Sequence, residues 1–313
     1  MADVKKIATR DSYGNALKEL GAEYDNLVVL DADLAGATKT GIFLKAYPQR
    51  HFDCGIAECN MVSVAAGMAT TGLVPFASSF AMFAAGRAFE QIRNSIGYPH
   101  LNVKIGATHG GISVGEDGAS HQCCEDFALM RSIPGMIVMS PADDVEAKAM
   151  VRAAYHHNGP VYMRFGRAAV PVIHEEDYQF QIGKGEVLRD GTDVAIIANG
   201  LLVYEAMVAA EELQNAGINA MVINMATIKP LDEELVLSAA QKCGKIITCE
   251  EHSIIGGLGE AVASLLCEKQ PTPLRRIGVN DEFGHSGPAA ALLKQFGLCA
   301  EHIVEVAKEF CGK

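Results

Sequence analysis

The sequence predicts an α/β protein of two domains, each a mostly parallel β-sheet flanked by helices. Three observations predict this fold. Short apolar runs typical of buried parallel strands alternate along the chain with segments of helical periodicity. The alternation stops in one segment and then starts again, as expected at a domain boundary. The length of 313 residues and the hydrophobic fraction of 49% are sufficient for two cores.

The first domain opens with a helix and then a strand. Apolar residues recur at near-helical spacing over residues 11–22, and the apolar run that follows, residues 26–33, is typical of a strand. Further strands are expected at residues 74–77, 103–108, 136–140 and 161–165. Helices are expected between them, among others at residues 61–70 and 145–156. Because helices and strands alternate, the sheet should be parallel and covered by helices.

A predicted linker, residues 169–188, separates a first domain of residues 1–168 from a smaller second domain of residues 189–313. It contains Pro171, a cluster of one histidine and three acidic residues, and no sustained period. After it, strands are expected at residues 194–198, 220–225, 245–250 and 275–279. Amphipathic helices that end in typical stop residues are expected at residues 203–217, 232–243 and 259–268.

Composition and charge exclude several classes of protein. The net charge of −12 leaves no basic surface for sequence-independent binding of nucleic acid. No apolar run reaches the roughly 18 residues of a membrane span, and the amino terminus lacks the apolar core of a signal peptide. Nine cysteines, an odd number without a Cys-x-x-Cys pair, indicate reduced thiols. We therefore expect a cytoplasmic protein with no nucleic-acid or membrane partner.

Residues 108–122 form an unusually polar, glycine-rich segment. It holds His109, His121, two acids and four glycines among fifteen residues, and glycines let a backbone come close to a bound molecule. His109 should lie at the carboxyl end of a buried strand, where open α/β sheets bind ligands. On its own, the segment fits an active-site loop and a polar surface loop equally well.

Glu58 stands at the expected start of a helix whose apolar positions turn inward. A carboxylate there could serve only to complement the helix dipole, by about 0.3 to 1 kcal/mol. The run Gly-Ile-Ala-Glu-Cys-Asn-Met, residues 55–61, however, closely resembles the glutamate motif of thiamine-diphosphate enzymes of the transketolase family. Residues 108–122 resemble the second motif of that family, and the resemblance extends from Arg10 to the carboxyl end.

The resemblance implies a particular domain composition. A full-length transketolase has a diphosphate-binding domain, a pyrimidine-binding domain and a smaller carboxyl-terminal domain, and this chain resembles the second and third. The first domain's Gly-Asp-Gly and Asn motif, which holds magnesium and the diphosphate, is not found. The resemblance thus implies the carboxyl-terminal subunit of a split transketolase, which self-associates as a dimer. Its cofactors would be thiamine diphosphate and Mg²⁺, the metal held mainly by an amino-terminal partner subunit and not by residues of this chain.

The resemblance also implies roles for individual residues near the cofactor. Glu58 would be catalytic and would hydrogen-bond the aminopyrimidine ring. Phe80 and Phe83 match the aromatic pair beside that ring, where flat faces stack on a flat heterocycle. Phenylalanines at this spacing are also common in an ordinary core.

A second group of residues matches the family's substrate site. His109 and His121 match the two catalytic histidines, and a neutral imidazole can exchange protons near neutral pH. His109 would also bind substrate, and Asp117 matches the acid that reads a substrate hydroxyl. Arg10 and Arg167 match arginines that clamp a sugar phosphate through planar, paired donors, with an ordinary surface ion pair as the alternative for each.

One departure from the family leaves the substrate open. Where the family commonly has a phosphate-binding serine, this chain has Ala37, and Thr38 beside it offers the nearest hydroxyl. The ketose donor and the aldose acceptor therefore stay unassigned, and the anionic tail need not be that of an ordinary pentose phosphate.

The sequence thus predicts a transketolase that moves a two-carbon ketol unit from a ketose phosphate to an aldose and is active only with its partner subunit. Two alternatives stay open. One is the β subunit of a 2-oxo acid dehydrogenase, and the Gly-Glu-Asp-Gly-x-x-His run of residues 115–121 favours transketolase over it. The other is a non-catalytic, transketolase-like scaffold, which the retained Glu58, His109, Asp117 and His121 disfavour.

The second domain has a glycine-rich segment of its own, residues 249–259, with two acids and His252. Its three glycines do not have the spacing of a dinucleotide fingerprint, so we expect no nucleotide site there. We expect His252 and the later His285 to be structural and not catalytic.

Overall fold

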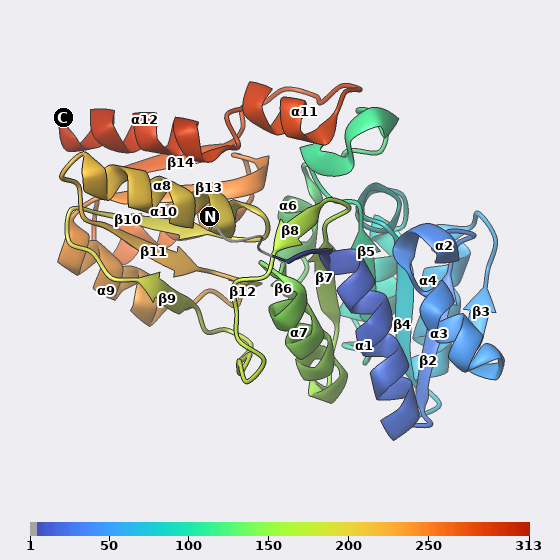
Figure 1. Ribbon diagram of the computed structural model, residues 1–313. Coiled ribbons are helices and arrows are strands. Elements are labelled where there is room, and N and C mark those ends of the chain that lie inside the picture. Colours follow the sequence, from blue (N-terminus) through green and yellow to red (C-terminus); the bar gives the residue numbers. More distant parts are fainter. Residues whose placement is uncertain (1–4) are drawn as a thin grey trace.

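The structure, a computed structural model that describes residues 5–313, consists of two α/β domains that lie side by side (Figure 1). The first is built on a seven-stranded sheet and the second on a five-stranded sheet. A short antiparallel pair, β1 (Lys6–Ala8) with β8 (Ala169–Pro171), lies at their junction. None of the helices within residues 5–313 combines the length and apolar character needed to cross a membrane.

The first sheet has the order β12-β6-β7-β5-β4-β2-β3, with every pair parallel except β12 with β6. Its strands are β2 (Leu27–Asp31), β3 (His51–Asp53), β4 (Val74–Phe80), β5 (Lys104–Thr108), β6 (Ile137–Met139), β7 (Val161–Phe165) and β12 (Thr227–Lys229). The strand β12 comes from the sequence of the second domain. It therefore joins the two domains through backbone hydrogen bonds.

Helices cover both faces of this sheet. One core lies under α1 (Thr9–Glu23), α3 (Gly41–Ala46) and α7 (Asp144–His156). The core of the opposite face lies under α4 (Glu58–Ala69), α6 (Asp126–Arg131) and the π-helical segments η2 (Met82–Arg87) and η3 (Ile92–Gly97). Shorter helices complete the domain: α2 (Ala35–Thr38), η1 (Pro48–Arg50), α5 (Phe89–Gln91) and η4 (Ile112–Asp117).

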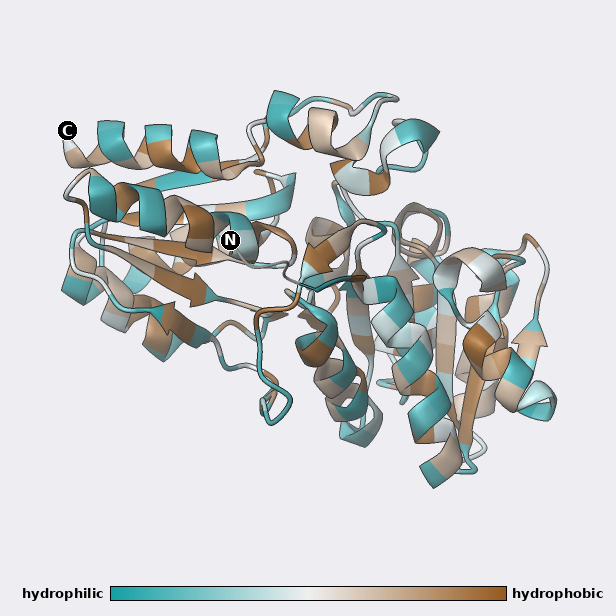
Figure 2. Cartoon of the chain, in the orientation of Figure 1, coloured by the Kyte–Doolittle hydropathy of each residue, from teal (hydrophilic) through white to brown (hydrophobic). Residues whose placement is uncertain are grey.

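The second sheet has the order β14-β13-β10-β11-β9 and is parallel except at β9. Its strands are β9 (Glu186–Arg189), β10 (Val194–Ala198), β11 (Ala220–Asn224), β13 (Ile246–Ser253) and β14 (Leu274–Val279). Helices α8 (Leu202–Asn215) and α12 (Ala300–Cys311) cover one face, and α9 (Glu233–Cys243) and α10 (Leu258–Lys269) cover the other. Apolar colouring runs along the strands, whereas the outer faces of the helices are polar (Figure 2).

The predicted fold class is confirmed, and the strands expected at 161–165 and 194–198 have the predicted bounds. The predicted linker, however, contains two strands, because β8 and β9 both fall within residues 169–188. Edge strands of three or four residues are too short to show a period, which is why the pattern missed them. The pattern also missed the short helices between residues 33 and 53 and the helices α11 (Ala289–Gln295) and α12. All nine cysteines are free thiols, as expected.

Candidate active site

The candidate site lies at the carboxyl ends of β4 and β5. These strands are parallel neighbours, and Phe80 and Thr108, their last residues, pair in register. Because parallel strands end at the same edge of a sheet, the residues that follow are brought together. The Phe80 ring stacks on His109, with ring centroids 3.9 Å apart and an interplanar angle of 28°. His109 therefore lies at the strand end, where the sequence predicted it.

His109 is held in one orientation and one protonation state. Its Nε2 lies 3.0 Å from Arg10 Nη1, which can only donate, so Nε2 accepts and the ring proton is on Nδ1. From there it donates to Thr108 Oγ1, 2.8 Å away. Burial, together with the nearby charges of Arg10 and Arg167, lowers the pKa of His109 to about 3. His109 is consequently neutral at neutral pH.

His121, near the other end of the loop, packs against Phe80 and Phe83. Its ring meets Phe83 edge-on at 5.2 Å and Phe80 at 6.2 Å between centroids. Its Nδ1 lies 2.9 Å from Ser120 Oγ. Phe80 and Phe83 themselves stack at 5.9 Å, although Phe80 ends a strand and Phe83 lies in η2. The four rings predicted from sequence thus form one continuous cluster.

Glu58 is buried at the first turn of α4, with 1% of its surface exposed. Its Oε2 accepts a hydrogen bond of 2.8 Å from Arg87 Nη1. The Arg87 guanidinium lies over the Phe83 ring, 4.6 Å from its centroid, and its side chain is half exposed. Arg87 therefore connects the carboxylate to the ring cluster. Sequence reasoning missed it, although a cation four residues after Phe83 on a helical segment was an available signal.

Two arginines predicted from sequence border the cluster. Arg10 Nη1 also donates to Ala37 O at 3.2 Å, while its buried Nε has no hydrogen-bond partner among residues 5–313. Arg167 donates to Val114 O and to Glu116 Oε2, the latter at 2.8 Å. Its positive charge contributes to lowering the pKa values of both Arg10 and His109, so the cations share one region.

The structure also places Thr38 and Asp117. Thr38 cannot replace the missing serine, because its hydroxyl is buried and donates to Asp31 Oδ2 at 2.7 Å. Asp117, at the end of η4, is exposed, and the acid that bonds Arg167 is its neighbour Glu116. The structure therefore brings together the rings and the arginines, whereas Asp117 lies exposed at the edge of this group.

The residues present fit one half of the predicted cofactor. A buried carboxylate and a cluster of flat rings suit the hydrogen bonding and stacking of an aminopyrimidine. The buried Arg10 Nε, a donor without a partner in the described part of the chain, suits an anionic group. In the described part of the chain, no group of three or more His, Cys, Asp or Glu side chains is arranged to hold a metal ion.

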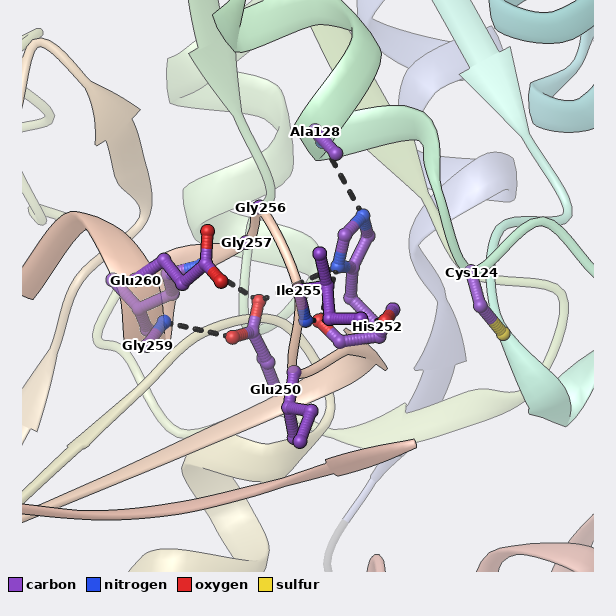
Figure 3. Close-up of polar contacts among 12 residues, drawn as sticks. Cys124, Ala128, Glu250, His252, Ile255, Gly256, Gly257, Gly259 and Glu260 are labelled. Carbon is purple, nitrogen blue, oxygen red and sulfur yellow. Dashed lines mark hydrogen bonds and ion pairs between the residues drawn. The ribbon is translucent and has the colours of Figure 1, made fainter. Parts of the chain in front are cut away.

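The glycine-rich segment of the second domain is built differently (Figure 3). Glu250 accepts hydrogen bonds of 2.7 Å from the backbone N–H groups of Leu258 and Gly259, which a phosphate would otherwise use. His252 is fully buried, stacks on Phe127 at 5.0 Å and lies 2.7 Å from Ser253 O through Nδ1. The polar groups of Glu250 and His252 therefore already have hydrogen-bond partners within the chain.

Two family profiles match the chain. Residues 5–172 match the profile described as transketolase, pyrimidine binding domain, and residues 183–303 match transketolase, C-terminal domain. The gap between the two lies inside the predicted linker.

Relatives resemble the chain over nearly its whole length. A putative transketolase C-terminal section from Methanocaldococcus jannaschii is 53% identical, over 95% of this chain and 94% of that protein. The 6-deoxy-6-sulfo-D-fructose transketolase subunit of a Clostridium species is 45% identical, over 96% and 93%. A solved structure described as a split gene transketolase, inactive beta4 tetramer, is 52% identical with a TM-score of 0.91, over 97% and 98% of the two chains. The protein belongs to the transketolase family and comprises its pyrimidine-binding and carboxyl-terminal domains.

Proposed function

We propose that this chain is the carboxyl-terminal subunit of a split transketolase that moves a two-carbon ketol unit from a ketose to an aldose. The observation that carries the proposal is the buried Glu58 carboxylate beside the four-ring cluster at the ends of β4 and β5. Thiamine diphosphate, when bound, supplies a nucleophilic carbon and an electron sink for breaking the carbon–carbon bond. The amino-terminal partner subunit holds its diphosphate and Mg²⁺, and the subunits assemble around a dimer of this chain.

Each residue then has a defined task. Glu58 hydrogen-bonds the aminopyrimidine, while its Oε2 accepts the hydrogen bond from Arg87. Phe80 and Phe83 provide apolar faces that exclude water from the ring. His121 exchanges protons with the reacting hydroxyl, while neutral His109, whose ring proton is on Nδ1, accepts a hydrogen bond from the substrate at Nε2. Asp117, exposed at the edge of the site, accepts a hydrogen bond from a substrate hydroxyl.

The substrate we propose is a ketose with an anionic tail, not restricted to phosphate. Arg10 and Arg167 provide the charge, and the buried Arg10 Nε supplies an unused donor. Ala37 and Thr38 provide no free hydroxyl, so the tail is held mainly by guanidinium groups. A relative named for a sulfonated ketose is consistent with a tail other than phosphate. A cytoplasmic location stays a prediction.

The test is Glu58→Gln in the complex of this chain with its amino-terminal partner. We expect ketol transfer to fall by about 10²- to 10⁴-fold, because the amide cannot share a proton with the aminopyrimidine. Glu212→Gln, an exposed position on α8, is the matched control and should leave the rate unchanged.

Four results would contradict the proposal. The first is near-normal turnover by Glu58→Gln. The second is efficient ketol transfer by this chain without a partner. The third is decarboxylation of a 2-oxo acid by the complex in place of ketol transfer. A complex that binds no thiamine diphosphate in calorimetric titration with magnesium would favour the scaffold alternative.

A further inference from the structure

The segment that carries His109 is built against the second domain. Helix α11 lies over η4 (Figure 1). Ile112, in η4, is fully buried in the core cluster of the second domain, in which Leu292 of α11 also lies. Gln122 Nε2 donates to His285 O at 3.0 Å. The loop that the first domain contributes to the candidate site therefore packs on one side against the second domain.

Glu251 on β13 contacts the backbone of this loop directly from the second domain. The side chain is buried, and its Oε1 accepts a hydrogen bond from the backbone N–H of Ser113. Its carboxylate also lies directly against Gly111, where a Cβ would overlap it. Gly111 has φ = +81°, so glycine is required there both for the backbone angle and for the approach of Glu251.

A buried cation supports the same turn from the first domain. Arg164, on β7, lies against Gly110, where a Cβ would also overlap it. Its Nη2 donates to Cys123 O at 2.9 Å, and its Nε lies 3.2 Å from Asp126 Oδ2. The backbone that leaves His109 thus passes between a buried arginine of one domain and a buried glutamate of the other.

His109 needs such external support. It is a non-glycine residue with φ = +58°, a conformation that costs of order 1–3 kcal/mol and persists only when its surroundings impose it. Its own side-chain bonds run to Thr108 and Arg10, and neither restrains the backbone of the next four residues. That backbone is held by hydrogen bonds from Gly111 N–H to Cys123 O and from Gln122 Nε2 to Ile112 O, and, from the second domain, by the hydrogen bond of Ser113 N–H to Glu251.

Glu250, the residue before Glu251, stabilises the start of α10 and not the loop. Successive side chains of a strand point to opposite faces, and Glu250 points to the start of α10 (Figure 3). It supports a helix of its own domain and has no hydrogen bond to the loop. The chain therefore offers two adjacent buried glutamates, of which one holds the loop.

We propose that Glu251 is a positioning residue, through which the second domain holds the backbone of residues 110–113 and so fixes His109 in the site. It touches neither cofactor nor substrate. The effect on rate rests on the ketol transfer proposed above, whereas the effect on the loop does not.

The rate experiment compares Glu251→Ala, Glu251→Gln and Glu250→Ala in the complex with the amino-terminal partner. We expect kcat/KM of Glu251→Ala to fall about a hundredfold, the cost of a displaced catalytic group. The affinity for thiamine diphosphate should stay unchanged, because Glu58 and Phe83 lie on other elements. Glu251→Gln should recover most of the rate, since its amide oxygen can accept the Ser113 N–H. Glu250→Ala should lower stability and leave kcat/KM unchanged.

A second readout is the ¹³C-histidine spectrum of the same complexes. The His109 signal should shift in Glu251→Ala and stay in place in Glu250→Ala. The proposal is overturned by an unmoved His109 signal, by equal rate losses in the two alanine variants, or by a glutamine variant as slow as alanine. If the wild-type complex shows no ketol transfer, the proposed function fails, and the His109 signal still decides whether Glu251 positions the loop.

Discussion

Two glycine-rich segments, residues 108–122 after β5 and residues 249–259 in and after β13, look alike in sequence but differ in structure. Both combine histidine, acids and several glycines at or beyond a strand end. In the second, Glu250 and His252 use their polar atoms on the same segment and on α6. In the first, the histidine rings face Phe80 and Phe83, and the buried Nε of the neighbouring Arg10 has no hydrogen-bond partner within the described residues.

The difference teaches that residue content alone does not make a site. A polar group that already has good partners inside the chain gains nothing from a ligand, whereas a buried group without one gains a full hydrogen bond. The same consideration distinguishes the two glutamates: both oxygens of Glu250 accept backbone hydrogen bonds, whereas within residues 5–313 only Oε2 of Glu58 accepts one, from Arg87. Three further predictions test this contrast.

The largest expected effect separates the two histidines. His109→Asn should lower kcat/KM for ketol transfer by about 10²-fold or more, because a fixed hydrogen-bonding group beside the reacting atoms is lost. His252→Asn should change kcat/KM less than about threefold, since the ring lies in a buried contact between domains, while a lost buried aromatic contact lowers stability. Steady-state kinetics of the reconstituted complex measure both. Equal losses of rate in the two variants would remove the distinction between the segments.

A smaller effect concerns glycine packing in the second segment. A Cβ at Gly257 would overlap the Glu250 carboxylate. Gly257→Ala should therefore lower the free energy of unfolding by about 1–3 kcal/mol without changing the rate per folded molecule. Urea unfolding measures this, and Gly36→Ala, where the structure leaves the added methyl group free space, is the control. A fall in rate at full stability would show that this turn also serves the site.

The smallest effect is shared by both segments. Burial lowers the pKa of His109 to about 3 and that of His252 to about 4. Below the unfolded value of about 6.5, the unfolded chain binds a proton that the folded chain does not, so stability falls as pH decreases. Between pH 7 and 5.5, each histidine should contribute a loss of about 1 kcal/mol. Urea unfolding at both pH values should show a smaller difference for His252→Asn than for the wild type, and an unchanged difference would contradict the assigned pKa.

Much of the site was predictable because it follows strand ends. His109, Phe80 and Glu58 are placed by local signals: an apolar run that stops, or a helix that starts. Arg87 and Glu251 were not predicted, because their importance comes from what they contact and not from their neighbours in sequence. Nor could spacing show that Thr38 donates to Asp31 and is therefore unavailable.

The sequence by itself determined the α/β class, most of the long strands and helices, the family resemblance and the residues of the ring cluster. These depend on periodicity and on short motifs, which are local properties of a chain. The tertiary structure alone decided the protonation state of His109, the use of β12 in the first sheet and the hold of Glu251 on the loop of residues 110–113. Burial and contacts between residues more than a hundred positions apart set these features, and only the folded chain defines them.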